Sequence, residues 1–378
     1  MTFTVVGDPA QVREVMRRTE DFAPTNALTS VVPLAPATLR ILSKARFALP
    51  PVLASATGER HRAVRTMVGR FFTPAKVAAV APRVRELARQ RLDAAAAGLR
   101  HGPVDLADAV ARHIPPLIMA GLTGQPIPEP GLLNRWSRDS LELFWGWPDP
   151  ERQQVLARSA AEFYGWLRGE AAAARGTASL FGVLDAAGLT QPEVCSLGYF
   201  LVIAGQETTS LLISTALYRG LESAGTESAG TESAGTESAG TGTPGPGPGG
   251  WAGLAEPGRA QAHVRRVLAA ESSVHTWRRA AVVDTTLGGA SLPAGAEILL
   301  ELSGHHPAGA GPTAYSLAFG HGLHRCLGAR LAELETALVV EETAAALPGL
   351  RLAGPPPQWL RLLSFQAPLT VTATQGEP

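Results

Sequence analysis

Apolar residues recur at helical spacing along most of the N-terminal half of the chain. Residues three and four positions apart lie on one face of a helix, so this pattern predicts amphipathic helices. The predicted helices cover residues 8–22, 58–72, 75–99, 104–122, 131–146 and 149–175, and a long helix begins at Pro192. Pro115 and Pro116 are expected to divide the helix over 104–122, because proline interrupts the helical hydrogen-bond ladder.

Alternation typical of strands is scarce before Val274. Residues 281–287, 296–302 and 370–374 then predict short strands, in addition to a strand at Val5 and Val6. A further helix is expected over 327–347. Many helices beside a few short strands predict a single domain over residues 1–378 that is mainly α with small β-sheets.

The longest apolar stretch, residues 194–221, is expected to be a buried helix. It contains Gln206, Glu207 and Arg219, and a charge at the centre of a bilayer is costly. We therefore predict that this segment does not span a membrane, and that the protein has no membrane partner.

A low-complexity segment follows. Residues 222–241 repeat ESAGT four times, and the residues up to 250 are rich in glycine and proline. This composition buries too little apolar surface to offset the entropy lost on folding. Residues 222–250 are therefore predicted to form a disordered surface loop, which is tolerated because the entropic cost of loop closure grows slowly with length. A specific recognition repeat is the alternative interpretation.

Composition narrows the class of protein. Apolar residues make up 45% of the 378 residues, enough for a sizeable core. Lys and Arg number 33, as do Asp and Glu, so the excess of basic residues that a nucleic-acid surface needs is missing. Cys195 and Cys326 are too few for a secreted disulfide framework, and the first residues lack the features of a signal peptide. These features predict a soluble, cytoplasmic protein.

Residues 319–332 read FGHGLHRCLGARLA and concentrate the candidate chemistry. Gly320, Gly322 and Gly328 surround Cys326, and glycine lets the backbone pass close to a large group. Helical sequence follows, and a helix N-terminus favours the thiolate form of a cysteine. These are the features that a thiolate ligand of a flat metal cofactor requires.

This segment resembles the signature of the cytochrome P450 family, F-x-x-G-x-[HR]-x-C-x-G. Its positions are filled by Phe319, Gly322, His324, Cys326 and Gly328. The resemblance implies the P450 fold, haem b as cofactor, Cys326 as the iron ligand, and contact of Phe319, Gly320 and Gly328 with the haem. The alternatives are a buried free cysteine and a zinc site of His321, His324 and Cys326, which lacks a fourth ligand at metal-site spacing.

Other segments match positions of the same family. Residues 204–209, AGQETT, resemble its oxygen-activating helix, which implies that Ala204 and Gly205 lie against the haem and that Glu207 and Thr208 relay protons to bound dioxygen. His61 and Arg65 resemble its H-x-x-x-R motif, and Arg279 resembles its R-x-A-x-x-D motif. The resemblance assigns these three residues and His324 to the haem propionates, which are carboxylates that arginine and histidine donors suit.

One expected family motif is missing. The position of the glutamate in E-x-x-R holds Arg266, and that of the arginine holds Ala269. The literal match from Glu256 to Arg259 contains Pro-Gly and lies too early in the chain. The shortened loop over 303–318 also lacks an arginine. Replacing a whole buried ion network can be nearly neutral, whereas losing one member is costly, so the fold and haem binding are expected to survive.

Three functions remain open from the sequence. The first is a haem-thiolate monooxygenase that oxidises a small hydrophobic organic molecule in natural-product biosynthesis, with electrons from a separate ferredoxin and reductase. The second is a haem-thiolate enzyme of atypical chemistry, peroxide-driven or rearranging. The third is a non-catalytic P450-like helper protein that binds another biosynthetic enzyme as its protein partner. In the family fold, the substrate pocket would here be lined by Leu53, Phe144, Trp145, Trp147 and His275.

Overall fold

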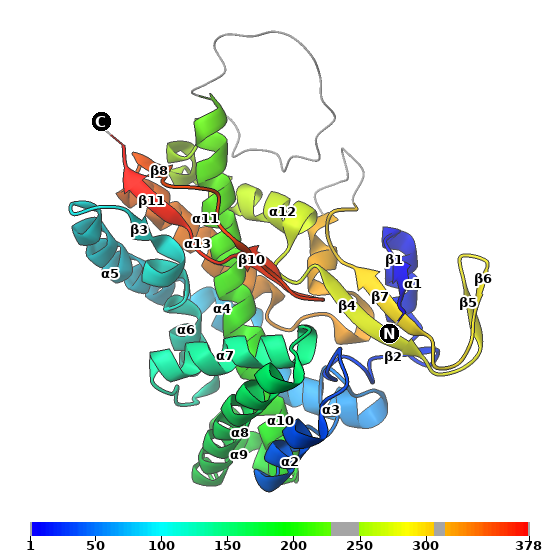
Figure 1. Ribbon diagram of the computed structural model, residues 1–378. Coiled ribbons are helices and arrows are strands. Elements are labelled where there is room, and N and C mark those ends of the chain that lie inside the picture. Colours follow the sequence, from blue (N-terminus) through cyan, green and yellow to red (C-terminus); the bar gives the residue numbers. More distant parts are fainter. Residues whose placement is uncertain (1, 228–248, 306–313, 377–378) are drawn as a thin grey trace.

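The computed structural model describes residues 2–227, 249–305 and 314–376. Helices form most of it (Figure 1). They are α1 (Pro9–Arg17), α2 (Pro36–Lys44), α3 (Gly58–Gly69), α4 (Pro74–Ala79), α5 (Ala81–Leu99), α6 (Ile114–Thr123), α7 (Pro130–Trp145), α8 (Pro150–Ala173), α9 (Leu180–Ala186), α10 (Gln191–Val202), α11 (Thr208–Glu227), α12 (Arg259–Glu271) and α13 (Ala329–Ala346). Short 3₁₀ or π turns are η1 (Ala107–Ala111), η2 (Ile203–Glu207), η3 (Ala252–Ala255), η4 (Ala314–Phe319) and η5 (Gly322–His324).

The strands form small separate sheets. They are β1 (Thr4–Val6), β2 (Phe22–Ala23), β3 (Val104–Asp105), β4 (Thr276–Ala281), β5 (Thr285–Leu287), β6 (Ala290–Leu292), β7 (Glu297–Glu301), β8 (Leu350–Leu352), β9 (Trp359–Arg361), β10 (Gln366–Pro368) and β11 (Thr372–Gln375). The largest sheet has the order β1-β7-β4-β2, in which β1 runs parallel to β7 and the other neighbours are antiparallel. The sheet β3-β11-β8 and the hairpins β5-β6 and β9-β10 complete the set. The mainly α fold with small β-sheets is confirmed.

Local signals in the sequence place the helix starts. The carboxylate of Asp8 accepts hydrogen bonds from the backbone N–H groups of Ala10 and Gln11, and so caps α1. Asp149 caps α8 in the same way. Thr190 and Glu193 form a reciprocal capping box at the start of α10. Each of these helices also has a proline in its first turn, where the missing N–H costs nothing.

The axis α10-η2-α11 runs through the middle of the molecule, and α11 is its longest visible part (Figure 1). The segment Gln191–Glu222 is long and apolar enough to cross a membrane by length and composition, but 61% of its most apolar window is buried within the protein. One large core cluster surrounds α5, α11 and α13, and a second surrounds α7, α8 and α10. The turn η2 contacts elements of both clusters, so the junction between α10 and α11 lies where they meet.

The structure corrects several of the sequence-based predictions. Residues 104–122 are divided just before Pro115 and Pro116, as predicted, and these prolines lie in the first turn of α6. The part before the break is not an α-helix, because Val104–Asp105 pairs with β11 as β3 and the π turn η1 follows. The helix predicted over 75–99 breaks between α4 and α5. The sequence pattern missed α2 and α9, which are short.

The predicted start of the loop, residue 222, lies too early in the chain. The helix α11 continues to Glu227, because alanine and glutamate in the first repeat are good helix formers and proline first occurs much later. Gly249 and Gly250 lie in a turn that leads into η3. Residues 228–248, which hold most of the predicted loop, lie outside the described residues.

The helices α12 and α13 are joined by an ion pair that sequence reasoning did not find. The guanidinium Nε of Arg265 lies 2.6 Å from Oε1 of Glu333, and Gln261 donates to the same oxygen at 3.0 Å. The Arg265 guanidinium also lies 4.9 Å from the centre of the Tyr315 ring. The segment that lacks E-x-x-R is therefore tied to α13 by a different set of polar residues.

Candidate active site

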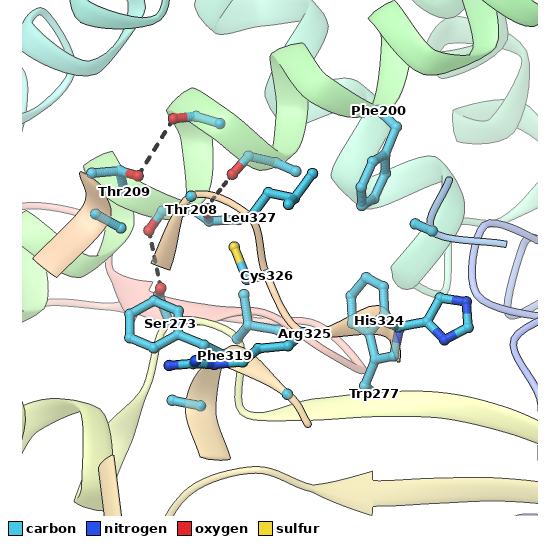
Figure 2. Close-up of a pocket in the computed structure, with 18 of the residues that line it drawn as sticks. Phe200, Thr208, Thr209, Ser273, Trp277, Phe319, His324, Arg325, Cys326 and Leu327 are labelled. Atoms are coloured by element: carbon cyan, nitrogen blue, oxygen red, sulfur yellow. Dashed lines mark hydrogen bonds between the residues drawn. The ribbon is translucent and has the colours of Figure 1, made fainter. Parts of the chain in front are cut away.

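A cavity lies between the α10-η2-α11 axis and the loop that precedes α13 (Figure 2). Of the residues that the sequence assigns to the haem or to proton transfer, those that line it are His61, Arg65, Ala204, Gly205, Thr208, Arg279, Phe319, Gly320, His324, Cys326 and Gly328. Glu207 has the same assignment and lines a different cavity. Residues from α3, η2, β4 and the cysteine loop, far apart in sequence, thus meet around one space.

The cysteine loop is shaped by glycine. Gly320 and Gly322 have φ of 72° and 65°, in the left-handed region that favours glycine. A Cβ on Gly322 would also lie 3.2 Å from the carbonyl oxygen of Met16. The backbone N–H of Cys326 donates to the carbonyl of Phe319 at 2.8 Å, which closes the loop just before α13. The loop holds the thiol at the cavity wall.

Cys326 is exposed, and it lines the cavity. Desolvation by the surrounding protein raises the pKa of the thiol. A hydrogen bond from the N–H of Gly328 and the charges of Arg65 and Arg325 oppose the shift, because each stabilises the thiolate. The helix itself begins at Ala329, so these named donors, rather than direct capping of α13 by the sulfur, favour the thiolate.

The turn η2 interrupts the helical ladder at the cavity. The Thr208 hydroxyl donates to the carbonyl of Ala204 at 2.6 Å, and the Ser273 hydroxyl donates to the carbonyl of Thr208 at 3.0 Å (Figure 2). A Cβ on Gly205 would lie 2.6 Å from Cε of Met119 in α6. Glycine here allows α6 to approach, and the threonine and serine satisfy carbonyls that the π turn exposes.

Glu207 lies on a different side of this axis from Thr208. It lines a second cavity of about 520 Å³, together with Arg112, Arg138 and residues of α7. Burial raises the pKa of the Glu207 carboxyl, and the charges of Arg138 and Arg112 act in the opposite direction. Glu207 and Thr208, which the sequence resemblance pairs, therefore line two separate cavities on different sides of the start of α11.

A buried basic set lies at one part of the first cavity. His61 is fully buried, and its ring lies 4.5 Å from that of His324 between centres. The Nε2–H of His324 donates to the carbonyl of Ala56 at 2.7 Å, and Arg65 donates to the carbonyl of Arg325 at 2.6 Å. Burial lowers the pKa of His324 to about 4 and also lowers that of His61.

This basic set has polar nitrogens that are not yet used. Among the described residues, both ring nitrogens of His61, Nδ1 of His324 and Nε of Arg279 are buried without a hydrogen-bond partner. Burial lowers the pKa of Arg279 to about 10, so its guanidinium stays protonated near neutral pH and its Nε–H can donate. A neutral histidine has one N–H, so His61 can donate from one ring nitrogen, and Nδ1 of His324 becomes a donor only when that ring is protonated. Buried polar groups are normally satisfied, so these nitrogens suit a ligand that carries acceptors. A flat cofactor with two carboxylates and a metal for the thiol fits the residues present.

The substrate-pocket residues expected from the sequence are brought together only in part. Leu53 and Trp145 line the cavity. Phe144 packs into the core of α7 and α8, Trp147 is exposed beside the second cavity, and the His275 ring nitrogen faces the carbonyl of Leu362. These three predictions are wrong, because neighbouring residues on a helix end or strand point in different directions.

Sequence reasoning missed four aromatic residues in the cavity wall, Phe72, Phe200, Trp277 and Phe365. Phe200 precedes η2 on α10 and could have been found from its helical spacing to Ala204 on the same face. Phe365 lies just before β10, and no nearby sequence pattern indicates its role, because its place depends on how the C-terminal strands return to β4.

The chain is similar to bacterial proteins of known kind, although no protein-family model matches it. It is 28% identical over 332 residues to cytochrome P450 monooxygenase PikC of Streptomyces venezuelae, across 82% of this chain and 72% of that protein. It is 25% identical over 360 residues to the erythromycin C-12 hydroxylase of Saccharopolyspora erythraea, across 89% and 80%. The solved structure of cytochrome P450 CREJ in complex with (4-ethylphenyl) dihydrogen phosphate has a TM-score of 0.85 and 25% identity, across 99% of this chain and 92% of that one.

Proposed function

The chain belongs to the cytochrome P450 family and is a haem-thiolate monooxygenase, and we propose that Cys326 is the ligand of its haem iron. One observation carries this assignment: the thiol lines the same cavity as basic side chains whose buried nitrogens have no partner among the described residues. We assign His61, Arg65, Arg279 and His324 to the two carboxylates of haem b. Charge-assisted hydrogen bonds of this kind are among the strongest that side chains make.

The chemistry of the proposed site divides between the cofactor and the chain. Haem, when bound, supplies an iron that activates dioxygen, and a thiolate ligand favours cleavage of the O–O bond. Phe319, Gly320 and Gly328 shape the wall next to the thiol. Ala204 and Gly205 present only small groups to the cavity, so the α10-α11 axis can lie close to a flat ligand.

Proton handling is assigned to Thr208 and Glu207. The Thr208 hydroxyl donates to the carbonyl of Ala204 and keeps its lone pairs for a donor in the cavity. Glu207 retains its proton to higher pH than an exposed carboxyl, because burial raises its pKa. We propose that protons pass from the second cavity through Glu207 to Thr208 at the start of α11.

The substrate is proposed to be a small hydrophobic molecule of natural-product biosynthesis. Much of the cavity wall is apolar, including Leu53, Ile203 and Val274, and such walls suit hydrophobic ligands. Two of the relatives, an erythromycin C-12 hydroxylase and a mycinamicin IV hydroxylase/epoxidase, carry names of that kind.

Electrons are proposed to come from a separate ferredoxin and reductase in the cytoplasm. Arg325 and Arg330 flank Cys326 along the chain and are exposed, and exposed cations suit an acidic protein surface. Cys195 and Cys326 are unpaired, as expected in a reducing compartment.

Absorption spectra of the purified protein test the cofactor assignment. The reduced protein under carbon monoxide should show the strongly red-shifted Soret band of a thiolate-ligated haem. Cys326→Ser should abolish that band. Cys195→Ala is the matched control and should preserve it, because Cys195 lies in the α10 core, away from the cavity.

Each contrary result has a defined meaning. Folded protein without a Soret band, even after reconstitution with haem, would overturn the assignment and favour the helper-protein function. A normal band with turnover supported by peroxide, and not by ferredoxin and reductase, would favour the atypical haem-thiolate enzyme.

A further inference from the structure

Six aromatic side chains line the cavity that holds Cys326. Two of them are Phe72 and Phe319, and the other four are Trp145 at the end of α7, Phe200 in α10, Trp277 in β4 and Phe365 before β10. These last four carry the argument that follows. Phe200 and Trp277 enter the cavity from opposite sides, one from the helical axis and one from the sheet (Figure 2).

Three of these rings form one contiguous wall. The centre of the Trp145 ring lies 5.0 Å from that of Phe365 and 6.3 Å from that of Trp277. The Trp277 and Phe365 rings are 6.4 Å apart and nearly perpendicular. Phe200 makes no ring contact with any of the three among the described residues, and it lines the same cavity from α10. A flat group between Phe200 and this wall would meet aromatic surface on both sides.

The charges around the cavity limit the ligand further. Among the described residues, no aspartate or glutamate lines it. A cationic ligand would therefore find no counter-charge and would meet the buried arginines and histidines. Those basic groups are already assigned to the carboxylates of haem, so they are not available to an anionic substrate.

We infer that this monooxygenase selects a neutral, planar aromatic substrate, held between Phe200 and the wall of Trp145, Trp277 and Phe365. The inference rests on the proposed function of the cavity. Aromatic rings attract one another in offset-stacked and edge-to-face arrangements, and a saturated ring of the same skeleton cannot make those contacts. Burial of apolar area alone would not distinguish the two, or would favour the larger saturated ring.

Calorimetric titration with two matched probes tests the inference. The probes are 2-naphthol and decahydro-2-naphthol, which share a carbon skeleton and a hydroxyl group and differ in aromaticity. Purified, haem-loaded protein should bind 2-naphthol at least ~10-fold more tightly, as expected from two or more ring contacts. Equal binding, or tighter binding of the saturated probe, would overturn the inference.

Variants identify the rings responsible. Trp277→Leu and Phe200→Leu remove one ring from each side of the slot, and each should reduce the preference for 2-naphthol to ~3-fold or less. Trp166→Leu is the matched control, because this half-buried tryptophan of α8 stacks near Trp136 and Phe163 and does not line the cavity. It should retain the full preference. An undiminished preference in both slot variants would also overturn the inference.

The same measurements separate this inference from the cofactor assignment. Haem binding is read independently from the Soret band, whereas the aromatic slot consists of residues of the chain itself. Protein that lacks the band but prefers 2-naphthol would contradict the cofactor assignment and support the slot. Protein with a normal band and no preference would contradict only the slot.

Discussion

Arg279 carries the clearest conflict between stability and function in the molecule. Its side chain is 1% exposed, its Nε has no partner among the described residues, and burial lowers its pKa to about 10. A buried cation without a counter-charge destabilises the fold. Natural proteins keep such groups where a ligand uses them. The buried, uncompensated charge of Arg279 therefore indicates that an anionic group binds beside it.

We predict that Arg279→Leu stabilises the haem-free protein and weakens haem binding. The lowered pKa of Arg279 corresponds to a penalty of at most roughly 3 kcal/mol, so the gain in unfolding free energy should be ~1–3 kcal/mol. Haem affinity should fall ~10–100-fold, because a charge-assisted hydrogen bond is lost. Denaturant titration of the haem-free protein and haem titration by absorbance measure the two effects.

The neighbouring Arg278 provides a matched control. Like Arg279 it is 1% exposed, its Nε has no partner among the described residues, and burial lowers its pKa to about 10. It differs in that it donates to two carbonyls from another segment, those of Ala27 and Thr29, and does not line the cavity, whereas Arg279 donates only to the carbonyl of its neighbour Arg278 among the described residues. Arg278→Leu should lower stability, because it leaves two buried acceptors unsatisfied, and should leave haem affinity nearly unchanged. If both variants change stability in the same direction, Arg279 is an ordinary structural arginine.

Glu335 makes the stability of the protein depend on pH. It lies in α13 with 1% exposure, its Oε2 has no partner among the described residues, and burial raises its pKa well above the usual range. The folded protein thus keeps this proton above the pH at which the unfolded chain releases it. Stability should fall as the pH rises from the unfolded-state pKa towards the raised one, by at most ~1.4 kcal/mol per pH unit.

Glu335→Gln should remove that dependence. Urea titrations between pH 5 and 8 should give a flatter stability curve for the variant than for the wild type. Glu20→Gln is the control, because Glu20 is exposed and its carboxylate makes no hydrogen bond or ion pair with the described residues. Curves for wild type and Glu335→Gln that run parallel over this range would show that Glu335 titrates normally.

At the scale of elements, the join between α12 and α13 explains how the fold can persist without E-x-x-R. Glu333 is mostly buried and is held by both Arg265 and Gln261. Removing one partner of a buried charge is costly, whereas replacing both can be nearly neutral. The helix α12 therefore lacks the E-x-x-R network, and it is held against α13 by the contacts of Arg265 and Gln261 with Glu333.

A double-mutant cycle tests this join. Arg265→Leu should lower the unfolding free energy by ~1–2 kcal/mol, a modest value because the Arg265 side chain is 40% exposed. The pair Arg265→Leu with Glu333→Leu should recover most of that loss. Removal of the exposed pair Arg83 and Glu86 on α5 should change stability by no more than ~0.5 kcal/mol. Strictly additive losses at Arg265 and Glu333 would contradict the coupling.

The limits of sequence reasoning are also clearest at the scale of elements. The cysteine loop could be predicted because its glycines and Cys326 are contiguous, and α13 follows directly. Glu207 and Thr208 are neighbours on a helix, so their side chains point in different directions. That each direction leads to a cavity depends on how α6 and α7 pack against η2, which no local pattern reveals. Phe365 is placed by its bridge to Val274, a residue far away in the sequence, and no local pattern reveals that either.

At the scale of the whole molecule, the cavity depends on contacts between distant parts of the chain. The sheet β1-β7-β4-β2 places Arg279 beside residues near the N-terminus, and Asn26 donates to its backbone carbonyl at 3.0 Å. The core of α5, α11 and α13 fixes the helix that follows Cys326. The repeat contributes nothing to the cavity wall among the described residues. This predicts that the length of the repeat can change without altering the site.

The residues on both sides of the undescribed segment are anchored to the same core. A Cβ on Gly220 of α11 would lie 3.1 Å from the Leu254 side chain and 3.2 Å from the Trp251 ring. The Trp251 indole donates to the carbonyl of Leu347 at 2.9 Å. Deleting residues 232–241, two copies of ESAGT, should therefore leave the Soret band unchanged and raise stability by roughly 0.6 kcal/mol through the shorter loop. Trp251→Ala is the contrast and should lower stability by ~3–5 kcal/mol. A deletion variant that loses haem or unfolds several degrees earlier would show that the repeat is part of the folded structure.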